Sequence, residues 1–379
     1  MIDRLGCEAV FRAAVAACDP EQRVRWTLAA NPPQGRFVFG LAIGKAAQAM
    51  ARGAGPVFHG VCVTHSLDGM AMPKGWYVIE AAHPIPDERS LAAGDAVCDL
   101  VASATAEDVV IALISGGASA LVERPVAGLS IEQFVREIQT LAETGADIHA
   151  LNAARTARSQ LKGGKLAELS AAPVRTLVAS DVVDDDVRVV GSGPTCTRRL
   201  GDTCTLAIPI RSFVQAIEVE LRHHVTWIDV RRDPLVAPVA TCADELLAGL
   251  DGDATRIAWG EPVLPLPAER GEGGRAQQLA LELARRIRAT DRFAFVAGSD
   301  GQDGPKPFGR PAPAGAFVDG TTWDRIADHL DPAAALARCD AGTALDRVGA
   351  LVITQATGIN HGDVVILGRS PVDAIRTAG

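Results

Sequence analysis

The sequence predicts an α/β protein of two lobes, a larger Rossmann-like domain built on a parallel sheet and a smaller α/β domain after it. Three observations lead to this fold class: short apolar runs typical of buried strands, Ala-rich helical segments between them, and a break in this alternation between about residues 200 and 255. The chain has 379 residues, of which 48% are hydrophobic, enough for two cores. We place the domains at residues 1–240 and 241–379, with the active site in the cleft between them.

Strands of the first domain are predicted where Val, Ile, Leu and Phe cluster. These runs are residues 36–43, 59–64, 76–81, 107–115 and 174–180. Helix-like stretches between them cover residues 44–53, 87–104 and 130–142. The first twenty residues have the pattern of an amphipathic helix and lack the basic and apolar regions of a signal peptide. Strands that alternate with helices favour a parallel sheet with helices on both faces.

The second domain follows a weakly patterned region. Residues 195–210 are irregular in composition, a helix is expected over 211–222, and little periodicity follows up to about 240. Beyond residue 255 the alternation resumes, with a long Gly/Pro-rich loop near its middle. The expected elements are strands at 255–259, 292–298, 350–354 and 363–367, and a helix at 274–289.

Composition excludes several classes of protein. The net charge is −9 and no Lys/Arg-rich run occurs, so nucleic acid and anionic membrane surfaces are not expected partners. No apolar stretch approaches the 18 residues that a membrane span needs. The eight cysteines are scattered without a C-x-x-C pair, which predicts buried free thiols in a reducing compartment, and hence a cytoplasmic location.

Glycine, lysine and serine follow the predicted strands of the first domain, where ligands of such folds bind. Gly44-Lys45 stands at a helix start, which suits an anionic oxygen, although Ala46 rules out a Walker A loop. The segment "SGGAS" at 115–119 lets backbone approach a ligand closely, and "KGGK" begins at Lys162. Each also has a purely structural interpretation, as an ordinary helix start, a tight turn or a helix C-cap.

The second half of the chain adds charged residues to glycine loops. Arg275 lies in the first turn of a predicted helix after "GEGG", a place that disfavours a cation unless an anion is near. Asp300 and Asp303 follow a strand and suit magnesium binding or general-base work, or else form a solvated turn. The segment "TGINHGD" at 357–363 carries further polar side chains after another strand.

Together these residues are the groups that phosphoryl transfer requires: loop amides and cations around phosphates, carboxylates for magnesium, and a base. Redox chemistry on a dinucleotide fits less well, because no strand is followed by G-x-G-x-x-G with an acidic residue downstream. A G-x-S-x-G hydrolase elbow is also absent from the sequence.

The order of motifs resembles that of the 2-phosphoglycerate-forming glycerate kinases, which combine a large kinase domain with a smaller C-terminal MOFRL domain. The motifs are "GKAAQAM", "HPIPDERS", "LISGGASAL", "LNAARTARSQLKGGKLA", "ASDVVDDDVRVVGSGPT", "GEGGRAQQLAL", "SDGQDGP", "PAGAFVD" and "TGINHGD". The resemblance covers nearly the whole chain. It implies transfer of the ATP γ-phosphate, with magnesium, to the 2-hydroxyl of D-glycerate.

The resemblance also implies roles for individual residues. The catalytic residues would be Lys45, Arg275, Asp181 and Asp300, with the two aspartates also serving as metal ligands. The nucleotide and phosphate ligands would be Gly44, Ser115, Gly116, Gly117, Ser119, Lys162, Gly163, Ser192 and Gly193. The substrate would be held by Asn152, Arg155, Glu261 and Asn360. The resemblance leaves open which carboxylate is the base.

Departures from the family pattern are concentrated in the C-terminal half. Ser299 replaces the threonine of a Thr-Asp-Gly loop, "KPFGRP" at 306–311 enlarges the next loop, and Asp184 stands where the family has glycine. An aspartate there predicts either a residue with positive φ or a turn of changed shape. The acceptor could therefore be another small hydroxy acid. Two alternatives remain: a reductase of hydroxypyruvate or tartronate semialdehyde, and a non-catalytic relative that binds a metabolite. Either a monomer or a homodimer is expected.

Overall fold

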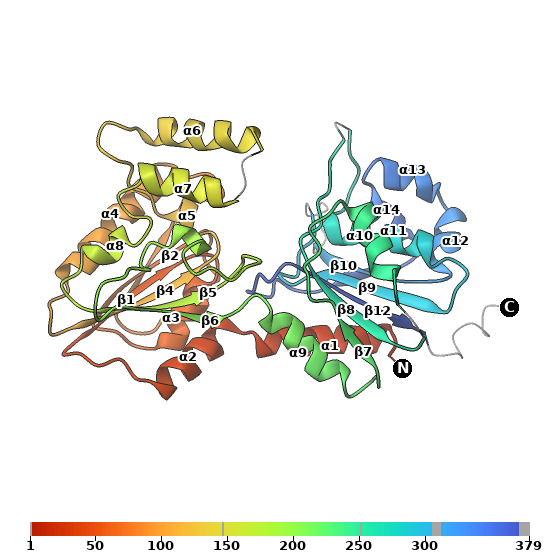
Figure 1. Cartoon of the computed structure of the whole chain (residues 1–379), viewed down its shortest axis with the longest axis horizontal. Helices are drawn as coiled ribbons and strands as arrows, with labels where there is room; N and C mark the ends of the chain where they lie inside the picture. Colours follow the sequence, from red (N-terminus) through yellow and green to blue (C-terminus); the bar gives the residue numbers. More distant parts are fainter. Residues whose placement is uncertain (1, 146–147, 251, 268, 305–311, 371–379) are drawn as a thin grey trace. The chain divides into compact units, whose positions relative to one another are not determined.

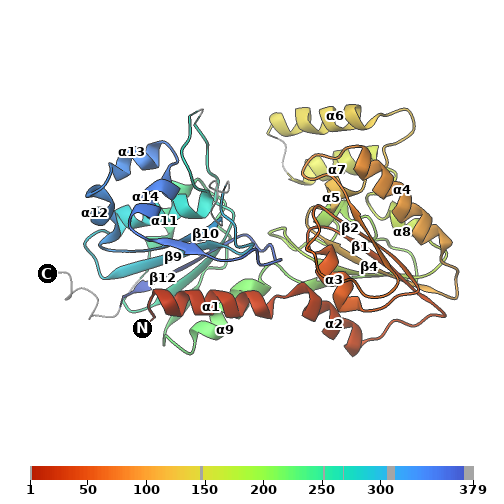
Figure 2. The same cartoon turned by 180° about the vertical axis from the view of Figure 1, so that it is seen from behind.

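The computed structural model describes residues 2–145, 148–250, 252–267, 269–304 and 312–370, which form two compact units (Figures 1 and 2). We call residues 19–210 the parallel-sheet unit, and residues 1–18 together with 211–379 the mixed-sheet unit. Each unit has its own six-stranded sheet, so the two-lobed α/β prediction is confirmed. The boundary at residue 240 and the cleft between the lobes stay predictions.

The sheet of the parallel-sheet unit has the order β3-β2-β1-β4-β5-β6, and all of its neighbouring strands run parallel. Its strands are β1 Val38–Ile43, β2 His59–Thr64, β3 Trp76–Glu80, β4 Val109–Ser115, β5 Val174–Ala179 and β6 Thr203–Ile208. The first five coincide with the predicted apolar runs. The sixth lies in the segment expected to be irregular, because its Thr and Cys residues break the apolar pattern.

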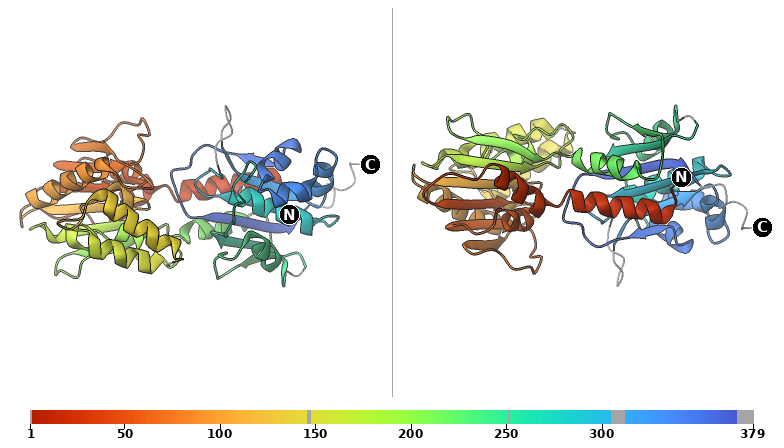
Figure 3. Two further views of the ribbon diagram at one scale, coloured as in Figure 1. Left: turned by 90° about the horizontal axis from the view of Figure 1, so that it is seen from above. Right: turned by 90° about the horizontal axis from the view of Figure 1, so that it is seen from below.

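Helices cover both faces of this sheet, as Figure 3 shows from above and below. They are α2 Pro20–Ala30, α3 Ala47–Ala54, α4 Glu88–Ser103, α5 Ala118–Leu121, α6 Ile131–Glu143, α7 Ile148–Arg158, α8 Lys165–Glu168 and the 3₁₀ turn η1 Val190–Ser192. Successive strand residues face opposite sides. Leu41 therefore packs in the core that contains α4, whereas Ala42 packs with α2 and α3.

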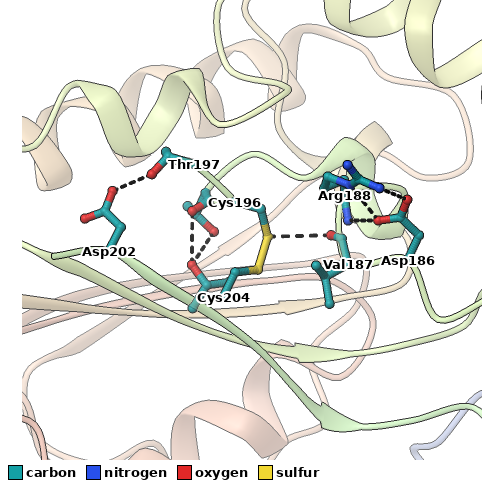
Figure 4. The surroundings of a disulfide bond; sticks show 9 residues. Asp186, Val187, Arg188, Cys196, Thr197, Asp202 and Cys204 are labelled. Carbon is teal, nitrogen blue, oxygen red and sulfur yellow. Dashed lines mark hydrogen bonds and ion pairs between the residues drawn. A yellow bond between two sulfur atoms is a disulfide. The ribbon is translucent and has the colours of Figure 1, made fainter. Parts of the chain in front are cut away.

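Two of the eight cysteines do not follow the prediction of free thiols. Cys196 and Cys204 form a disulfide between the loop after η1 and the first strand residues of β6 (Figure 4). The other six are free and buried, as predicted. Sequence spacing gave no sign of the pair, because the two residues meet only when the chain reverses at Gly201 and enters β6.

The sheet of the mixed-sheet unit has the order β11-β10-β9-β12-β8-β7. Its strands are β7 Ile228–Val230, β8 Thr255–Gly260, β9 Arg292–Gly298, β10 Pro313–Asp319, β11 Leu351–Ile353 and β12 Asp363–Arg369. Strands β7 and β8 pair parallel, whereas β9 pairs antiparallel with β10 and β12. Strand β10 was expected to be part of a Gly/Pro-rich loop, and β7 falls in the weakly patterned region. The enlargement at 306–311 lies outside the described residues.

Helices of this unit again lie on both faces of their sheet. They are α1 Arg4–Ala17, α9 Ser212–Leu221, α10 Val239–Leu247, α11 Arg275–Arg286, α12 Thr322–Ala327, α13 Pro332–Ala337 and α14 Ala341–Arg347. On β9, Val296 packs in the core with α10 to α14, while Phe295 contacts Phe11 of α1. Over the ranges that the structure describes, no helix is both long and apolar enough to cross a membrane.

Candidate functional site

Lys45 lies where β1 ends, in a turn that is tied to the end of β4. Its backbone N–H donates to the carbonyl of Gly116 at 2.9 Å, and the next amide, of Ala46, donates to Ser115 Oγ at 3.1 Å. Because β1 and β4 are neighbouring parallel strands, their carboxyl ends meet at one edge of the sheet. The structure thus brings together Gly44-Lys45 and the "SGG" turn, two segments that the sequence places seventy residues apart.

The glycines of this turn let charged side chains approach the backbone. A Cβ on Gly116 would lie 1.9 Å from Asp181 Oδ2, so the carboxylate of Asp181 rests directly against this glycine. Gly117 has φ 86°, and a Cβ there would lie 3.2 Å from both Lys45 and His83. The side chains of Lys45, Asp181 and His83 therefore lie around one short turn, residues 115–117, which we call the lysine turn.

His83 is a residue of this site that the sequence analysis did not assign. Burial, followed by the positive charge of Lys45, lowers the pKa of His83 to about 4. The imidazole is therefore neutral at pH 7 and can donate and accept hydrogen bonds, but it adds no positive charge. The signal that could have identified it is the "HPIP" segment, which places a histidine shortly after β3, near the end of a strand.

Ser119, Ser192 and Asn152 form a chain of hydrogen bonds. Ser192 Oγ donates to Asn152 Oδ1 at 2.7 Å, and so Ser119 supplies the proton of the 3.0 Å bond between the two hydroxyls. Both serine hydroxyl protons are therefore used within the protein. Asn152 is buried, and within the described part of the chain its Nδ2 has no hydrogen-bond partner. The unused donor of this group is thus the Asn152 amide.

Lys162 is predicted to bind phosphate, but the structure gives it a buried partner. Its side chain is 2% exposed and forms an ion pair with Glu123, which also accepts a hydrogen bond from Ser159 at 2.5 Å. Burial lowers the pKa of Lys162, and Glu123 acts in the opposite direction. A phosphate could reach this ammonium group only if the ion pair opened. The backbone of the "KGG" segment is instead hydrogen-bonded to the end of η1 and the residue after it. Gly163 N–H donates to the Ser192 carbonyl, and Gly164 N–H donates to the Gly193 carbonyl.

The four aspartates at 181–186 have separate roles. Asp184 lies within 3.5 Å of His149 at the surface. Asp185 accepts a hydrogen bond from the Ile210 amide at 2.8 Å and so fixes the loop, and Asp186 pairs with Arg188. The positive φ considered for Asp184 falls on the next residue, because Asp185 has φ 55°. Asp184 itself does not have a positive φ.

The mixed-sheet unit contains a second set of predicted residues around a cavity of about 550 Å³. Glu261, Arg275, Asp300 and Asn360 all line it. They come from the ends of β8, β9 and the loop before β12, and from the first turn of α11. The structure therefore brings together all four site residues that were predicted for this half of the chain.

Arg275 finds the anion that its position in the first turn of α11 requires. Its Nε donates to Asp363 Oδ2 at 2.8 Å, and its guanidinium lies 3.5 Å from Glu261. Burial raises the pKa of Asp363 to about 7, although Arg275 acts in the opposite direction. Asp363 was not predicted as a site residue, because only the tertiary structure brings β12 beside α11.

Asp303 is a capping residue in this structure. Its carboxylate accepts hydrogen bonds from the backbone N–H groups of Ala276 at 3.0 Å and Gln277 at 2.8 Å, the free donors at the start of α11. Asp300, which follows the same strand, lines the cavity and accepts a local bond from Gln302 N–H at 3.0 Å. Asp303 also lines the cavity, but it is buried and its carboxylate is used by the start of α11, so Asp300 is the aspartate that is more available to a ligand.

Comparisons with known proteins agree on one family. A model described as a domain of unknown function, DUF4147, matches residues 6–226, and the MOFRL family model matches residues 254–363. A D-glycerate 2-kinase of Thermotoga maritima is 30% identical over 94% of this chain and 96% of its own length. A putative hydroxypyruvate reductase of Agrobacterium vitis is 31% identical over 94% of this chain and 92% of its own. The crystal structure of a glycerate kinase from Thermotoga maritima superposes with a TM-score of 0.87 and 28% identity, over 97% of this chain and 99% of that chain.

Proposed function

Because the chain belongs to the glycerate 2-kinase family, with its DUF4147 and MOFRL domains, we propose that it is an ATP- and magnesium-dependent kinase. It transfers the γ-phosphate of ATP to the 2-hydroxyl of D-glycerate, or of a closely related small hydroxy acid. With D-glycerate the product is 2-phosphoglycerate. The substrates are small molecules, the chain is a monomer or a homodimer, and its location is the cytoplasm.

The lysine turn is the observation that carries this proposal. A lysine beside glycine backbone can bind phosphate oxygens and stabilise the negative charge that develops on a transferring phosphoryl group. Asp181 rests against Gly116 in the same turn. The neutral imidazole of His83 adds a donor without increasing the charge. Neither redox nor hydrolytic chemistry needs this combination.

The cavity around Arg275 supports an acidic acceptor. A guanidinium binds a carboxylate through two parallel hydrogen bonds, while amide and carboxylate side chains such as Asn360 and Glu261 bind hydroxyl groups. Arg275 is held by Asp363, so its position is fixed before a ligand arrives. Asp300 lines the same cavity and is our candidate for the base that accepts the hydroxyl proton.

Acidic residues of the candidate site suit magnesium that is bound together with a nucleotide, as it is in kinases. Among the residues that the structure describes, no group of three or more His, Cys, Asp or Glu side chains could hold a metal by itself. Magnesium bound with a nucleotide needs only one or two carboxylates together with phosphate oxygens and water. Asp181 and Asp300 are suitable ligands, and the metal would neutralise phosphate charge.

The test is an assay of ADP release with Mg-ATP and a panel of small 2- and 3-hydroxy acids. We expect turnover with D-glycerate or a close analogue, and ³¹P NMR of the product to give the phosphorylated hydroxyl. Folded protein that binds ATP but turns over none of these acids would contradict the proposal. It would then support the alternative of a relative that binds a metabolite without catalysis.

A reductase is the second candidate, favoured by the similarity to a putative hydroxypyruvate reductase. The absence of a G-x-G-x-x-G fingerprint speaks against it. Loss of NADH or NADPH absorbance with hydroxypyruvate or tartronate semialdehyde would support reduction. We expect no such loss under conditions in which ADP is released.

A further inference from the structure

A second cavity, of about 290 Å³, lies in the parallel-sheet unit and has no role in the chemistry described so far. One wall is the loop that begins at His83, and the other is α6, which lies with α7 on one side of the sheet (Figure 1). Gly117 and Ser119 form part of its lining. The cavity therefore begins at the lysine turn and extends away from it toward α6.

The walls of this cavity carry apolar side chains. Ile85 is 52% exposed, a large area for an isoleucine, and it faces Val135 and Ile138 of α6 across the cavity. Contact between water and these apolar side chains is unfavourable. A ligand with an apolar surface would displace this water and so gain binding free energy. A small hydroxy acid has hardly any apolar surface, so it does not match such walls. A planar ring with apolar faces does.

One positive charge at the cavity has no anionic partner. Arg155 of α7 lines it, is half-buried, and makes no hydrogen bond or ion pair with any other described residue. The nearest acid that acts on it is Glu123, which is already paired with Lys162. Burial lowers the pKa of Arg155, but a guanidinium does not lose its proton in proteins. A partly desolvated, unpaired arginine in a cavity is suited to an anionic ligand.

We infer that this cavity binds the nucleoside end of the nucleotide, an inference that rests on the proposed kinase function. The base lies between Ile85 and the Val135–Ile138 side of α6, Arg155 meets a phosphate close to the ribose, and the chain of phosphates leads past Ser119 to the lysine turn. A ligand with one apolar planar end and one anionic end matches the two kinds of lining. The cavity volume is at the low end of the roughly 300–1,000 Å³ of small-molecule sites, in keeping with a part of a ligand.

The test compares ADP with inorganic tripolyphosphate, which has no nucleoside, by titration calorimetry. Ile85→Ala and Val135→Ala should each weaken ADP binding by about tenfold, as expected for loss of two or three buried methyl or methylene groups. Tripolyphosphate binding should not change. Arg155→Met, which keeps an unbranched apolar side chain but removes the charge, should weaken both ligands. Ile353→Ala is the matched control, because Ile353 is also 52% exposed but lies on β11 and does not line this cavity.

The outcomes separate this inference from the proposed function. If phosphoryl transfer proceeds and both alanine variants keep wild-type ADP affinity, the nucleoside lies elsewhere and the inference is wrong while the function stands. If the variants raise the KM for the hydroxy acid and leave the KM for ATP unchanged, the cavity holds the acid. That result would also overturn the inference that the cavity binds the nucleoside. A wild-type protein that binds neither ADP nor ATP contradicts the function itself. Thermal unfolding of each variant controls for damage to the fold.

Discussion

Among single residues, Lys45 is the most direct test of the phosphoryl-transfer site. Its side chain is exposed, and its Cγ would lie 3.2 Å from a Cβ placed on Gly117 of the lysine turn. Lys45→Ala should lower kcat by about a hundredfold or more, because it removes a charge that stabilises the transition state. Lys74→Ala is the matched control, since Lys74 is exposed and away from the turn. Equal kcat values for the two variants, measured by ADP release, would contradict a catalytic role for Lys45.

Asp363 makes the stability of the protein depend on pH in a defined direction. Its pKa is about 7 in the folded protein against an ordinary value of 3.8, so the folded state holds a proton that the unfolded state releases. This contribution is fully present below pH 4 and is lost as the pH rises to 7. The free energy of unfolding of the wild type, relative to Asp363→Asn, should therefore fall by about 1.4 kcal/mol per pH unit in that window.

Urea unfolding at pH 5, 6, 7 and 8 measures this difference. The asparagine variant keeps the shape of the side chain but does not titrate, so other groups cancel in the comparison. We expect the difference to level off above pH 7. A difference that stays constant from pH 5 to 8 would instead show that Arg275, whose Nε lies 2.8 Å from Asp363, keeps Asp363 ionised throughout.

At the scale of helices and strands, Asp303 shows how one segment can cap another. The N-cap residue of α11, Gly274, has no side chain to accept hydrogen bonds, and Asp303 from the loop after β9 takes over that task. Asp303→Ala should lower the free energy of unfolding by about 1–2 kcal/mol, because two buried N–H groups lose their acceptor. Asp99→Ala, at an exposed position on α4, should change it little. Urea unfolding of both variants would contradict the capping role if the two losses were equal.

Local pattern was sufficient for strands with a continuous apolar run and for helices with a clear helical periodicity. The five strands from β1 to β5, together with α4, α6 and α11, lie where periodicity placed them. The strand-end rule predicted that Lys45 and the "SGG" turn each lie where ligands bind, and the structure adds that the two segments meet. Strand β10 was missed because its sequence, "PAGAFVD", begins with Pro and Gly, which normally interrupt strands. Its antiparallel pairing with β9 and β11 makes it a strand.

Long-range contacts account for what the sequence did not reveal. Asp363 meets Arg275 across 88 residues, and Lys162 meets Glu123 across 39. From the residue types alone, the sequence predicted that each of these positions carries a charged group. Which partner each would find depends on the packing of distant elements, so Lys162 was predicted to bind a phosphate although a buried carboxylate neutralises it. The roles assigned to the individual site residues stay predictions for the assays above.

At the scale of the whole molecule, the two units have separate cores, one of them built from a continuous segment. The parallel-sheet unit, residues 19–210, contains the apolar cores on both faces of its sheet and the Cys196–Cys204 disulfide. We expect this fragment to fold alone, because its main apolar contacts are internal. A cooperative urea transition with native-like far-UV circular dichroism is the expected result. A fragment that binds ANS and unfolds without cooperativity would contradict it.

The mixed-sheet unit, by contrast, is assembled from two separate segments, since α1 is first in the chain but packs on β9 and α9. Phe11 is 1% exposed, and its ring centroid lies 5.5 Å from that of Phe213 and 5.7 Å from that of Phe295. Phe11→Ala should destabilise this unit by about 3–5 kcal/mol, the usual cost of removing a buried aromatic ring. Leu5→Ala on the same helix is the control, because Leu5 is 70% exposed. Hydrogen exchange followed by mass spectrometry should show faster exchange of residues 211–370 in the Phe11 variant, with residues 19–210 unchanged. Faster exchange confined to residues 4–17 would instead mean that α1 detaches without weakening the sheet it covers.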